Sequence, residues 1–231
     1  MSRKLYDLAG ADPERRFSPY CWRAKLALAH KGLDVDTVPW RFTEKDAIAF
    51  SGQARVPVLV DGDNVVFDSW TIANYLEDTY PDRPSLFGGA GGRALARFVN
   101  NWVDVTVHGA MIRLLVLDIH DHAHNKDRGY FRESREKRLG MRLEDAVADR
   151  DQRVATFRQV LEPMRQTLKA QPYLCGDAPA YADYIVLGAF QWARCISAFL
   201  LIEADDPVAL WRTRMLQLFG GMPGNAVGYA A

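Results

Sequence analysis

Cysteine is scarce in this chain of 231 residues, and the three that occur, Cys21, Cys175 and Cys195, lie far apart. An odd number of widely spaced cysteines fits reduced thiols better than a disulfide framework. Long apolar runs are also missing, since none approaches the roughly 18–20 residues that a membrane-spanning helix needs. The opening "MSRKLYDLAG" lacks the apolar core of a signal peptide. Together these absences predict a cytoplasmic protein without a membrane-spanning segment.

A net charge of either sign is absent too, because 29 lysines and arginines balance 29 aspartates and glutamates. This balance gives no reason to expect nucleic acid or an anionic membrane as a partner. The hydrophobic fraction of 48% is ordinary for a globular protein, and the length allows one large domain or two small ones. The sequence contains no internal repeat and no low-complexity tract.

The first 80 residues carry patterns of both strands and helices. Four short runs predict strands, at residues 4–8, 34–38, 56–60 and 65–67. One helix is expected after Ser18 as N-cap with Pro19 in its first position, and a second helix is expected to end before Pro81. The order β-α-β followed by β-β-α predicts a small α/β domain.

After residue 80 the sequence changes character. Proline and glycine are concentrated in "YPDRPSLFGGAGG", which predicts a linker at residues 81–92. From Arg93 onward, apolar residues recur at the three- and four-residue spacing of helices. Further helices are expected at residues 151–170, 181–199 and 207–219. The sequence therefore predicts an α/β domain at 1–80 and an all-helical domain at 93–231.

The stretch "SPYC", residues 18–21, has the spacing of a thiol–disulfide site but carries serine in place of the first cysteine. A hydroxyl at a helix N-terminus can help to hold an anion, because free amides and the helix dipole favour negative charge there. Two interpretations of Ser18 stay open, a plain helix cap or a cap that also stabilises a bound anion. Cys21 is expected to be a packing residue, since the attacking cysteine of a redox site stands at the helix entrance.

Four stretches give the chain a family resemblance: "SPYCWRAKLALAHKG", "RVPVLVDG", "VFDSWTIANYLEDTYPDRP" and "YADYIVLGAF". On these stretches, which are spread over most of its length, the chain resembles the cytosolic glutathione transferases. Within that superfamily it looks most like the bacterial enzymes that cleave β-aryl ethers of lignin, and their fungal relatives. That finer similarity rests on the opening "SPYC" stretch, "YFRESREKRLGMRLEDAVADRD" and "NWVDVTVHGAMIRLLVLDIHD". The resemblance implies a thioredoxin-like N-terminal domain followed by an all-helical C-terminal domain, with glutathione as co-substrate.

The resemblance also implies how the thiol of glutathione is held. Ser18 is expected to stabilise the thiolate by donating a hydrogen bond to the sulfur. Val56 is expected to pair through its backbone with the cysteinyl part of glutathione, and Pro57 after it is expected to be cis. An ordinary proline at the start of a strand is the alternative for Pro57.

The two ends of glutathione need charged partners. The resemblance assigns the γ-glutamyl group to Asp68 and Ser69, although Asp68 also suits a helix cap. The glycyl carboxylate requires a cation from the segment before the hairpin. Arg41, Lys45 and Arg55 all qualify, and Arg41 and Arg55 are the preferred candidates.

The second substrate is expected to be a hydrophobic or aromatic electrophile bound between the domains. Candidate lining residues are Tyr20, Trp102, Met111 and Leu115. The last three form a stripe at helical spacing, and such a stripe is more often core than pocket. The implied reaction is attack of glutathione thiolate on an electrophilic carbon, in the finer version with cleavage of a β-aryl ether. Two alternatives stay open, a ligand-carrying protein with little turnover and a glutathione disulfide reductase that depends on Cys21. The resemblance further implies a homodimer.

The segment "DIHDHAH" places a cluster of acids and histidines at Asp118, His120, His122 and His124. Alternating positions suit neither one helix face nor the usual spacing of zinc ligands. We therefore expect a solvated loop between helices here and no metal.

Overall fold

The computed structural model of the chain describes residues 3–230. Its N-terminal part is a four-stranded sheet in the order β2-β1-β3-β4. The strands are β1 (Arg3–Leu8), β2 (Asp36–Trp40), β3 (Val58–Asp61) and β4 (Asn64–Phe67). β1 runs parallel to β2 and antiparallel to β3, and β3 and β4 form an antiparallel hairpin. The sheet therefore exposes β4 as an edge strand.

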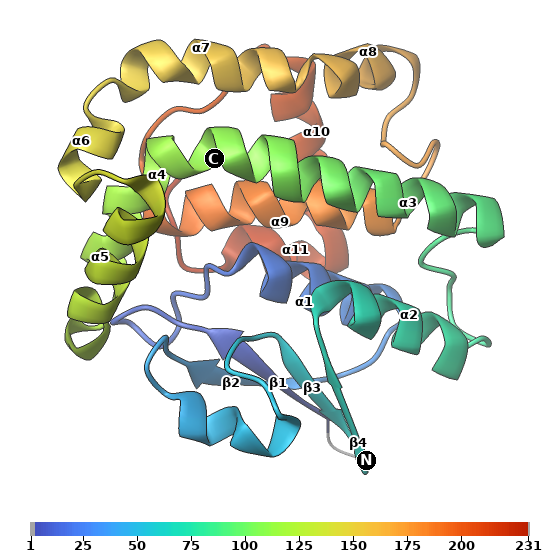
Figure 1. The fold of residues 1–231 in the computed structure, drawn as a ribbon. Coiled ribbons are helices and arrows are strands. Elements are labelled where there is room, and N and C mark those ends of the chain that lie inside the picture. The colour runs from blue at the N-terminus through green and yellow to red at the C-terminus, as the bar shows by residue number, and fades with distance from the viewer. Residues whose placement is uncertain (1–2, 231) are drawn as a thin grey trace.

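Two helices of this part separate the sheet from the rest of the molecule. They are α1 (Pro19–His30) and α2 (Ser69–Thr79), and both lie between the sheet and the later helices (Figure 1). A short 3-10 helix, η1 (Lys45–Ser51), follows β2. The N-termini of α1 and α2 and the start of β3 carry the residues for which the sequence predicts glutathione contacts.

The remainder of the described chain is helical. The helices are α3 (Ala90–Trp102), α4 (His108–His122), α5 (Asn125–Leu139), α6 (Leu143–Val147), α7 (Arg150–Val160), α8 (Glu162–Ala170), α9 (Tyr181–Ile196), α10 (Pro207–Leu216) and α11 (Leu218–Asn225). A π-helical turn, η2 (Val103–Val107), joins α3 to α4. None of the helices within residues 3–230 has the length and apolarity to cross a bilayer. The predicted fold class, a thioredoxin-like unit followed by an all-helical one, is confirmed, whereas the domain boundaries stay a prediction.

Several element boundaries differ from the predicted ones for local reasons. The third strand begins at Val58 and not at residue 56, because Pro57 has no N–H to donate to a ladder. The helix predicted over 151–170 is two helices, with Pro163 near the start of the second. The last predicted helix already ends at Leu216, and Phe219 beyond it has a positive φ of 53°.

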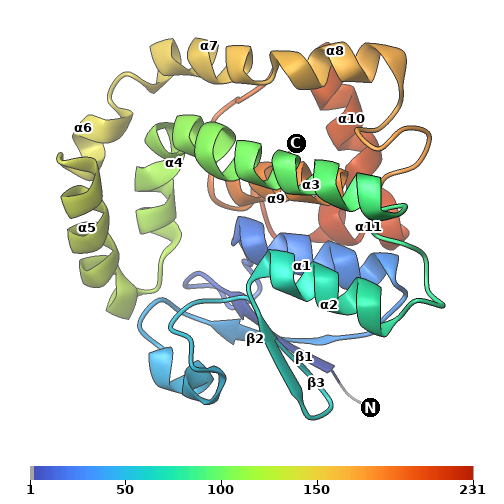
Figure 2. The same ribbon diagram turned by 45° about the vertical axis from the view of Figure 1, so that its right-hand side comes forward.

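α9 is the central helix of the core and supports the start of α1. All but two of its residues are buried, and in both views it lies between α3 and α1 (Figures 1 and 2). Gly188 permits this approach, since a Cβ there would lie 2.5 Å from the carbonyl oxygen of Pro19. The helical part thus contacts α1 directly beside its N-cap.

Candidate active site

Ser18 is the N-cap of α1 and is nearly buried, with 4% of its surface exposed. Its Oγ accepts a hydrogen bond from the backbone N–H of Cys21 at 3.2 Å. A hydroxyl that accepts in one contact still has its own proton to donate. The structure therefore combines the cap with a donor that a ligand at the helix N-terminus can use.

The loop that leads to Ser18 is fixed from several sides. Trp22 donates its Nε1–H to the carbonyl of Arg16 at 2.8 Å, and the N–H of Ala11 donates to the carbonyl of His122 at 2.8 Å. Below the loop, the fully buried carboxylate of Asp7 lies 2.7 Å from the ammonium of Lys25. These contacts, which come from both the α/β and the helical part, leave the Ser18 cap little freedom to shift.

Cys21 lies one turn into α1 with none of its surface exposed. Its Sγ is 3.9 Å from the carbonyl oxygen of Tyr6. Burial raises the pKa of the Cys21 thiol well above its usual range, and the nearby charge of Asp7 adds to the rise. The thiol is thus neutral and inaccessible in this conformation, which is the packing role expected from the sequence.

The Val56–Pro57 peptide bond is cis, as predicted. Pro57 is buried and Val56 is half-buried immediately before β3. The proposed pairing of Val56 with a ligand backbone is not tested by this geometry and stays a prediction.

Asp68 and Ser69 open α2. Asp68 caps the helix, since its Oδ1 accepts from the N–H groups of Trp70 and Thr71, each at 3.0 Å. Its φ of 69° is unusual for a residue with a side chain and costs free energy, as is common at functional sites. The cap interpretation is therefore correct for Oδ1. Among residues 3–230, no hydrogen-bond donor contacts Oδ2 of Asp68.

Ser69 is buried, and its backbone is held from the helical part. Its carbonyl oxygen accepts a 2.8 Å hydrogen bond from the hydroxyl of Tyr181 on α9. This bond ties the N-terminus of α2 to the helix that also supports α1. The N-termini of α1 and α2, two of the three elements with predicted glutathione contacts, are therefore both supported by α9.

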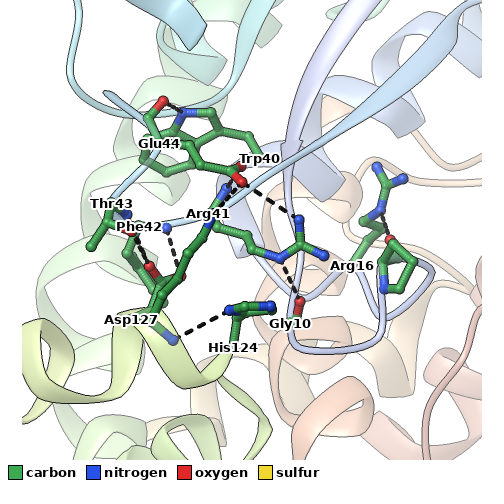
Figure 3. A network of polar contacts seen from close by, with 11 residues as sticks. Gly10, Arg16, Trp40, Arg41, Phe42, Thr43, Glu44, His124 and Asp127 are labelled. Carbon is green, nitrogen blue, oxygen red and sulfur yellow. Dashed lines mark hydrogen bonds and ion pairs between the residues drawn. The ribbon is translucent and has the colours of Figure 1, made fainter. Parts of the chain in front are cut away.

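The two preferred cations for the glycyl carboxylate have different surroundings. Arg41 is engaged within the protein, because its Nε donates to the carbonyl of Gly10 at 3.2 Å and its Nη1 lies 3.6 Å from Glu44 (Figure 3). Arg55 is exposed, and no carboxylate of the described residues lies within 4.0 Å of it. The structure thus favours Arg55 as the free cation, while its contact with glutathione stays a prediction.

Asp127 of α5 bonds the loop that follows Arg41 (Figure 3). The carboxylate is fully buried and accepts from the N–H of Phe42 at 3.0 Å and from the N–H of Thr43 at 3.1 Å. It thereby fastens the loop after β2 to the start of α5, which lie side by side in Figures 1 and 2. The sequence did not reveal this role, because nothing in the charged pattern of residues 125–139 distinguishes a buried aspartate from a solvated one.

The predicted electrophile-binding residues do not share one surface. Tyr20 is exposed by 37% and packs edge-on against His108, with ring centroids 5.6 Å apart. Trp102 is half-buried, whereas Met111 and Leu115 are fully buried in the core. For these last two the structure realises the core alternative and offers no surface to a substrate in this conformation.

A buried polar network beneath Tyr20 was missed at the sequence level. The guanidinium of Arg23, fully buried on α1, donates to Asn100 at 3.0 Å and to Asp104 at 2.8 Å, and it stacks 4.8 Å from the Tyr20 ring. His108 lies 3.7 Å from the same carboxylate. Burial, and then the charge of Arg23, lowers the pKa of His108 to about 3. In the sequence, the sign of this network is Arg23 itself, a charged residue among the apolar residues of α1.

Both parts of the chain match domains of known proteins. Residues 13–84 match the N-terminal domain of glutathione S-transferases, and residues 94–199 match their C-terminal domain. The chain belongs to the glutathione S-transferase superfamily. Glutathione is the co-substrate of this family.

Similar proteins within the superfamily come from plants and fungi. Glutathione S-transferase 4 of Zea mays is 29% identical over 202 residues, which cover 84% of this chain and 82% of that one. A glutathione S-transferase of Ceriporiopsis subvermispora, whose structure was solved with glutathione, has a TM-score of 0.84 at 23% identity and covers 94% of this chain and 96% of its own. A glutathione transferase of Phanerochaete chrysosporium has a TM-score of 0.84 at 24% identity, covering 96% and 97%. At these identities the structural similarities show the fold.

The histidine segment differs from the predicted loop. α4 continues through His122, so a helix and not a loop carries residues 118–122; the favourable stacking of α4 on the core outweighs the polar composition. His122 contacts the hydroxyl of Tyr229 at 3.0 Å, and His124 accepts from the N–H of Lys126 as the cap of α5. Within residues 3–230, no group of three or more His, Cys, Asp or Glu side chains is placed to hold a metal ion.

Proposed function

We propose that this protein is a glutathione transferase in which Ser18 stabilises the glutathione thiolate. The observation that carries the proposal is the hydroxyl of Ser18 at the N-terminus of α1, with its oxygen bonded to Cys21 and its proton available. A free thiol of this kind has a pKa of about 8.5, and lowering it by two units requires about 2.7 kcal/mol. One hydroxyl donor together with the positive end of the helix dipole can supply stabilisation of that order.

Three further segments of the chain bind the other parts of glutathione. The backbone of Val56 binds the cysteinyl part, and Asp68 with the N-terminus of α2 binds the γ-glutamyl group. Arg55 holds the glycyl carboxylate, which is supported by its exposure and by the engagement of Arg41 elsewhere. The free Oδ2 of Asp68 supports its assignment to the ammonium group.

The reaction is a displacement at carbon. The thiolate sulfur forms a bond to an electrophilic carbon, and the leaving group departs with the electron pair of the bond that breaks. In the β-aryl ether version the carbon lies next to an aryl ketone, whose carbonyl delocalises developing charge, and a phenolate leaves. The resemblance of the two long helical stretches to ether-cleaving enzymes supports this version.

The Cys21-dependent disulfide reductase is the less favoured alternative. Such an enzyme needs an accessible thiolate, whereas Cys21 is fully buried and its pKa is raised. A ligand-carrying protein would need no thiolate stabiliser, so the available Ser18 proton argues for the transferase.

A panel of aryl ethers, aryl halides and isothiocyanates, each tested with and without glutathione, examines the proposal directly. We expect glutathione-dependent release of the leaving group from at least one class. Tight binding of glutathione and of the aromatic compounds without any turnover would instead identify a carrier.

We also propose that the protein forms a homodimer. Large apolar side chains are exposed in the helical part and on the edge strand of the sheet: Leu95, Phe98 and Val105 on α3 and η2, and Val65 and Phe67 on β4. The first three are exposed by 70–76%, which is costly in water for a monomer. A second copy that covers this surface would remove that cost.

A further inference from the structure

Three arginines around the site have no acidic partner. Arg55 precedes Val56 in the α/β part, and Arg135 and Arg138 lie on α5 of the helical part. Within residues 3–230, no carboxylate oxygen lies within 4.0 Å of any of the three, although many other arginines of the chain form such pairs. Unpaired charges of one sign that gather from two parts of the fold call for an explanation.

Arg135 is held toward the site by aromatic rings. Its guanidinium stacks 4.6 Å from the ring of Phe131 and 5.4 Å from that of Phe42. The ring of Phe42 lies in turn 6.2 Å from Phe17, the residue directly before Ser18. The side chain of Arg135 is therefore half-buried and fixed on the side of α5 that faces the N-terminus of α1.

Arg138 follows Arg135 by three residues, so both side chains lie on the same face of α5. Its charge also reaches Tyr20. Burial and the charge of Asp104 raise the pKa of the Tyr20 hydroxyl, whereas the charges of Arg23 and Arg138 lower it. Arg138 therefore shares the face of α5 that carries Arg135, and its charge acts on Tyr20, the exposed candidate for the electrophile site.

The three arginines also act on one another. Burial lowers the pKa of Arg135, and the charges of Arg138 and Arg55 lower it further. Like charges repel one another, and an anion bound beside these arginines would relieve that repulsion. One carboxylate, the glycyl end of glutathione, suffices for Arg55, which leaves the two arginines of α5 without an anion.

We propose that Arg135 and Arg138 bind an acidic group of the second substrate, so that the protein prefers aromatic electrophiles that carry a carboxylate. This inference rests on the proposed transferase function, whose thiolate site Arg138 would face across Tyr20. Arg138 makes the direct contact, because it is exposed, and Arg135 supplies the second charge from its stacked position.

A matched pair of aryl halides tests the preference: 4-chloro-3,5-dinitrobenzoate and its methyl ester. In both, the glutathione sulfur bonds to the ring carbon that carries chlorine, chloride leaves with the electron pair, and the thiol proton goes to solvent. We expect the wild-type ratio of kcat/KM for acid over ester, each corrected for the uncatalysed rate, to exceed one. Arg138→Gln should lower that ratio roughly ten- to a hundred-fold, the value of one charged hydrogen bond.

Arg142→Gln is the matched control. Arg142 is also an arginine near the end of α5, but its side chain is 70% exposed and paired with Glu144 at 3.4 Å. It should leave the ratio of acid to ester unchanged. A wild-type ratio of one or less, or an equal fall of the ratio in both variants, overturns the proposal.

Binding measurements separate this inference from the proposed function. With glutathione present, calorimetry should show tighter binding of 3,5-dinitrobenzoate than of its methyl ester, and Arg138→Gln should abolish the difference even if no electrophile is turned over. If Arg138→Gln instead weakens glutathione and leaves the acid preference intact, the anion held is the glycyl carboxylate, and the proposal is wrong. If binding shows the acid preference but no turnover occurs with any electrophile, the transferase function fails and the anion site stands.

Discussion

At the scale of single residues, the chemistry depends on which atom of the "SPYC" stretch is accessible. Ser18 keeps a proton to donate at the entrance of α1, whereas Cys21 is buried with its thiol proton retained. A protein thiolate at position 18 would attack the disulfide of oxidised glutathione, forming a mixed disulfide with one glutathione and releasing the other as its thiolate. A hydroxyl resists oxidation and so leaves glutathione as the free nucleophile.

Replacing Ser18 with alanine separates thiolate stabilisation from binding. We expect Ser18→Ala to reduce turnover by roughly ten- to a thousand-fold and to raise the pKa of bound glutathione, because the donor to sulfur is lost. The affinity for glutathione should change only a few-fold, since its other contacts remain. Titration of the ultraviolet absorbance of the bound thiolate measures the pKa. An unchanged rate at neutral pH would show that Ser18 is only a cap.

Exchanging oxygen and sulfur should affect conjugation differently at Ser18 and at Cys21. Cys21→Ser should leave conjugation within a few-fold of wild type, with a modest stability loss, because the residue only packs. Ser18→Cys should weaken conjugation and introduce reduction of glutathione-containing disulfides. Both activities are measured on both variants. Loss of conjugation in Cys21→Ser would instead indicate a redox site.

At the scale of elements, the site depends on how α9 is held. The N-cap position of α9 is Ala180, which has no polar side chain, and the buried Asp183 instead accepts from the backbone N–H of Ala180 at 3.3 Å. Its carboxylate accepts from the N–H of Leu174 at 2.8 Å and from Nε1 of Trp211 at 2.9 Å. Since α9 also supports α1 through Gly188 and α2 through Tyr181, its start affects the whole site.

Asp183→Ala should therefore destabilise the protein by about 3 kcal/mol or more, because several buried donors lose their acceptor. Urea unfolding followed by circular dichroism measures the loss. Asp177→Ala is the control, since that carboxylate is exposed nearby and should change stability by less than about 0.5 kcal/mol. Equal effects of the two substitutions would contradict the role of Asp183.

Local signals predicted most elements, and contacts between distant segments account for what was missed. The helix cap at Ser18 and the unusual proline at Val56–Pro57 could be predicted from the sequence, because each depends only on neighbouring residues. The burial of Asp127 and the Arg23–Asp104 pair depends on segments that lie 80 or more residues apart in the chain. Polar composition suggested a loop at 118–124, whereas packing of α4 extends the helix. The sequence shows which polar side chains could bind a ligand. It does not show which of them are already engaged within the protein, as Arg41 is with Gly10 and Glu44.

At the scale of the whole molecule, the apolar surface of α3 and β4 bears on assembly. Phe98→Glu places a charge on the exposed apolar surface of α3 and should shift the protein from dimer to monomer. Light scattering coupled to size-exclusion chromatography measures the mass. Leu210→Glu, at another exposed apolar residue, is the control and should leave the mass unchanged. A monomeric wild type at micromolar concentration would refute the dimer.

The response of the whole molecule to acid follows from His108, which lies where α1, α4 and α9 meet. Its ring packs between Tyr20 and Trp192, and burial lowers its pKa from 6.5 to about 3. Between these values the unfolded chain binds a proton that the folded chain does not, so stability falls as the pH drops below about 6.5. The slope from this group approaches about 1.4 kcal/mol per pH unit.

His108→Gln removes that proton-binding group and should flatten the acid limb of the stability curve by this amount between pH 6 and pH 4, relative to wild type. The variant will be less stable at pH 8, because glutamine does not reproduce the ring contacts with Tyr20 and Trp192. The test is therefore the slope of the unfolding free energy against pH, from urea titrations at each pH, and not its absolute value. Parallel curves for the two proteins would show that His108 is protonated in the folded state at the same pH as in the unfolded chain, and that the network beneath Tyr20 does not couple folding to pH.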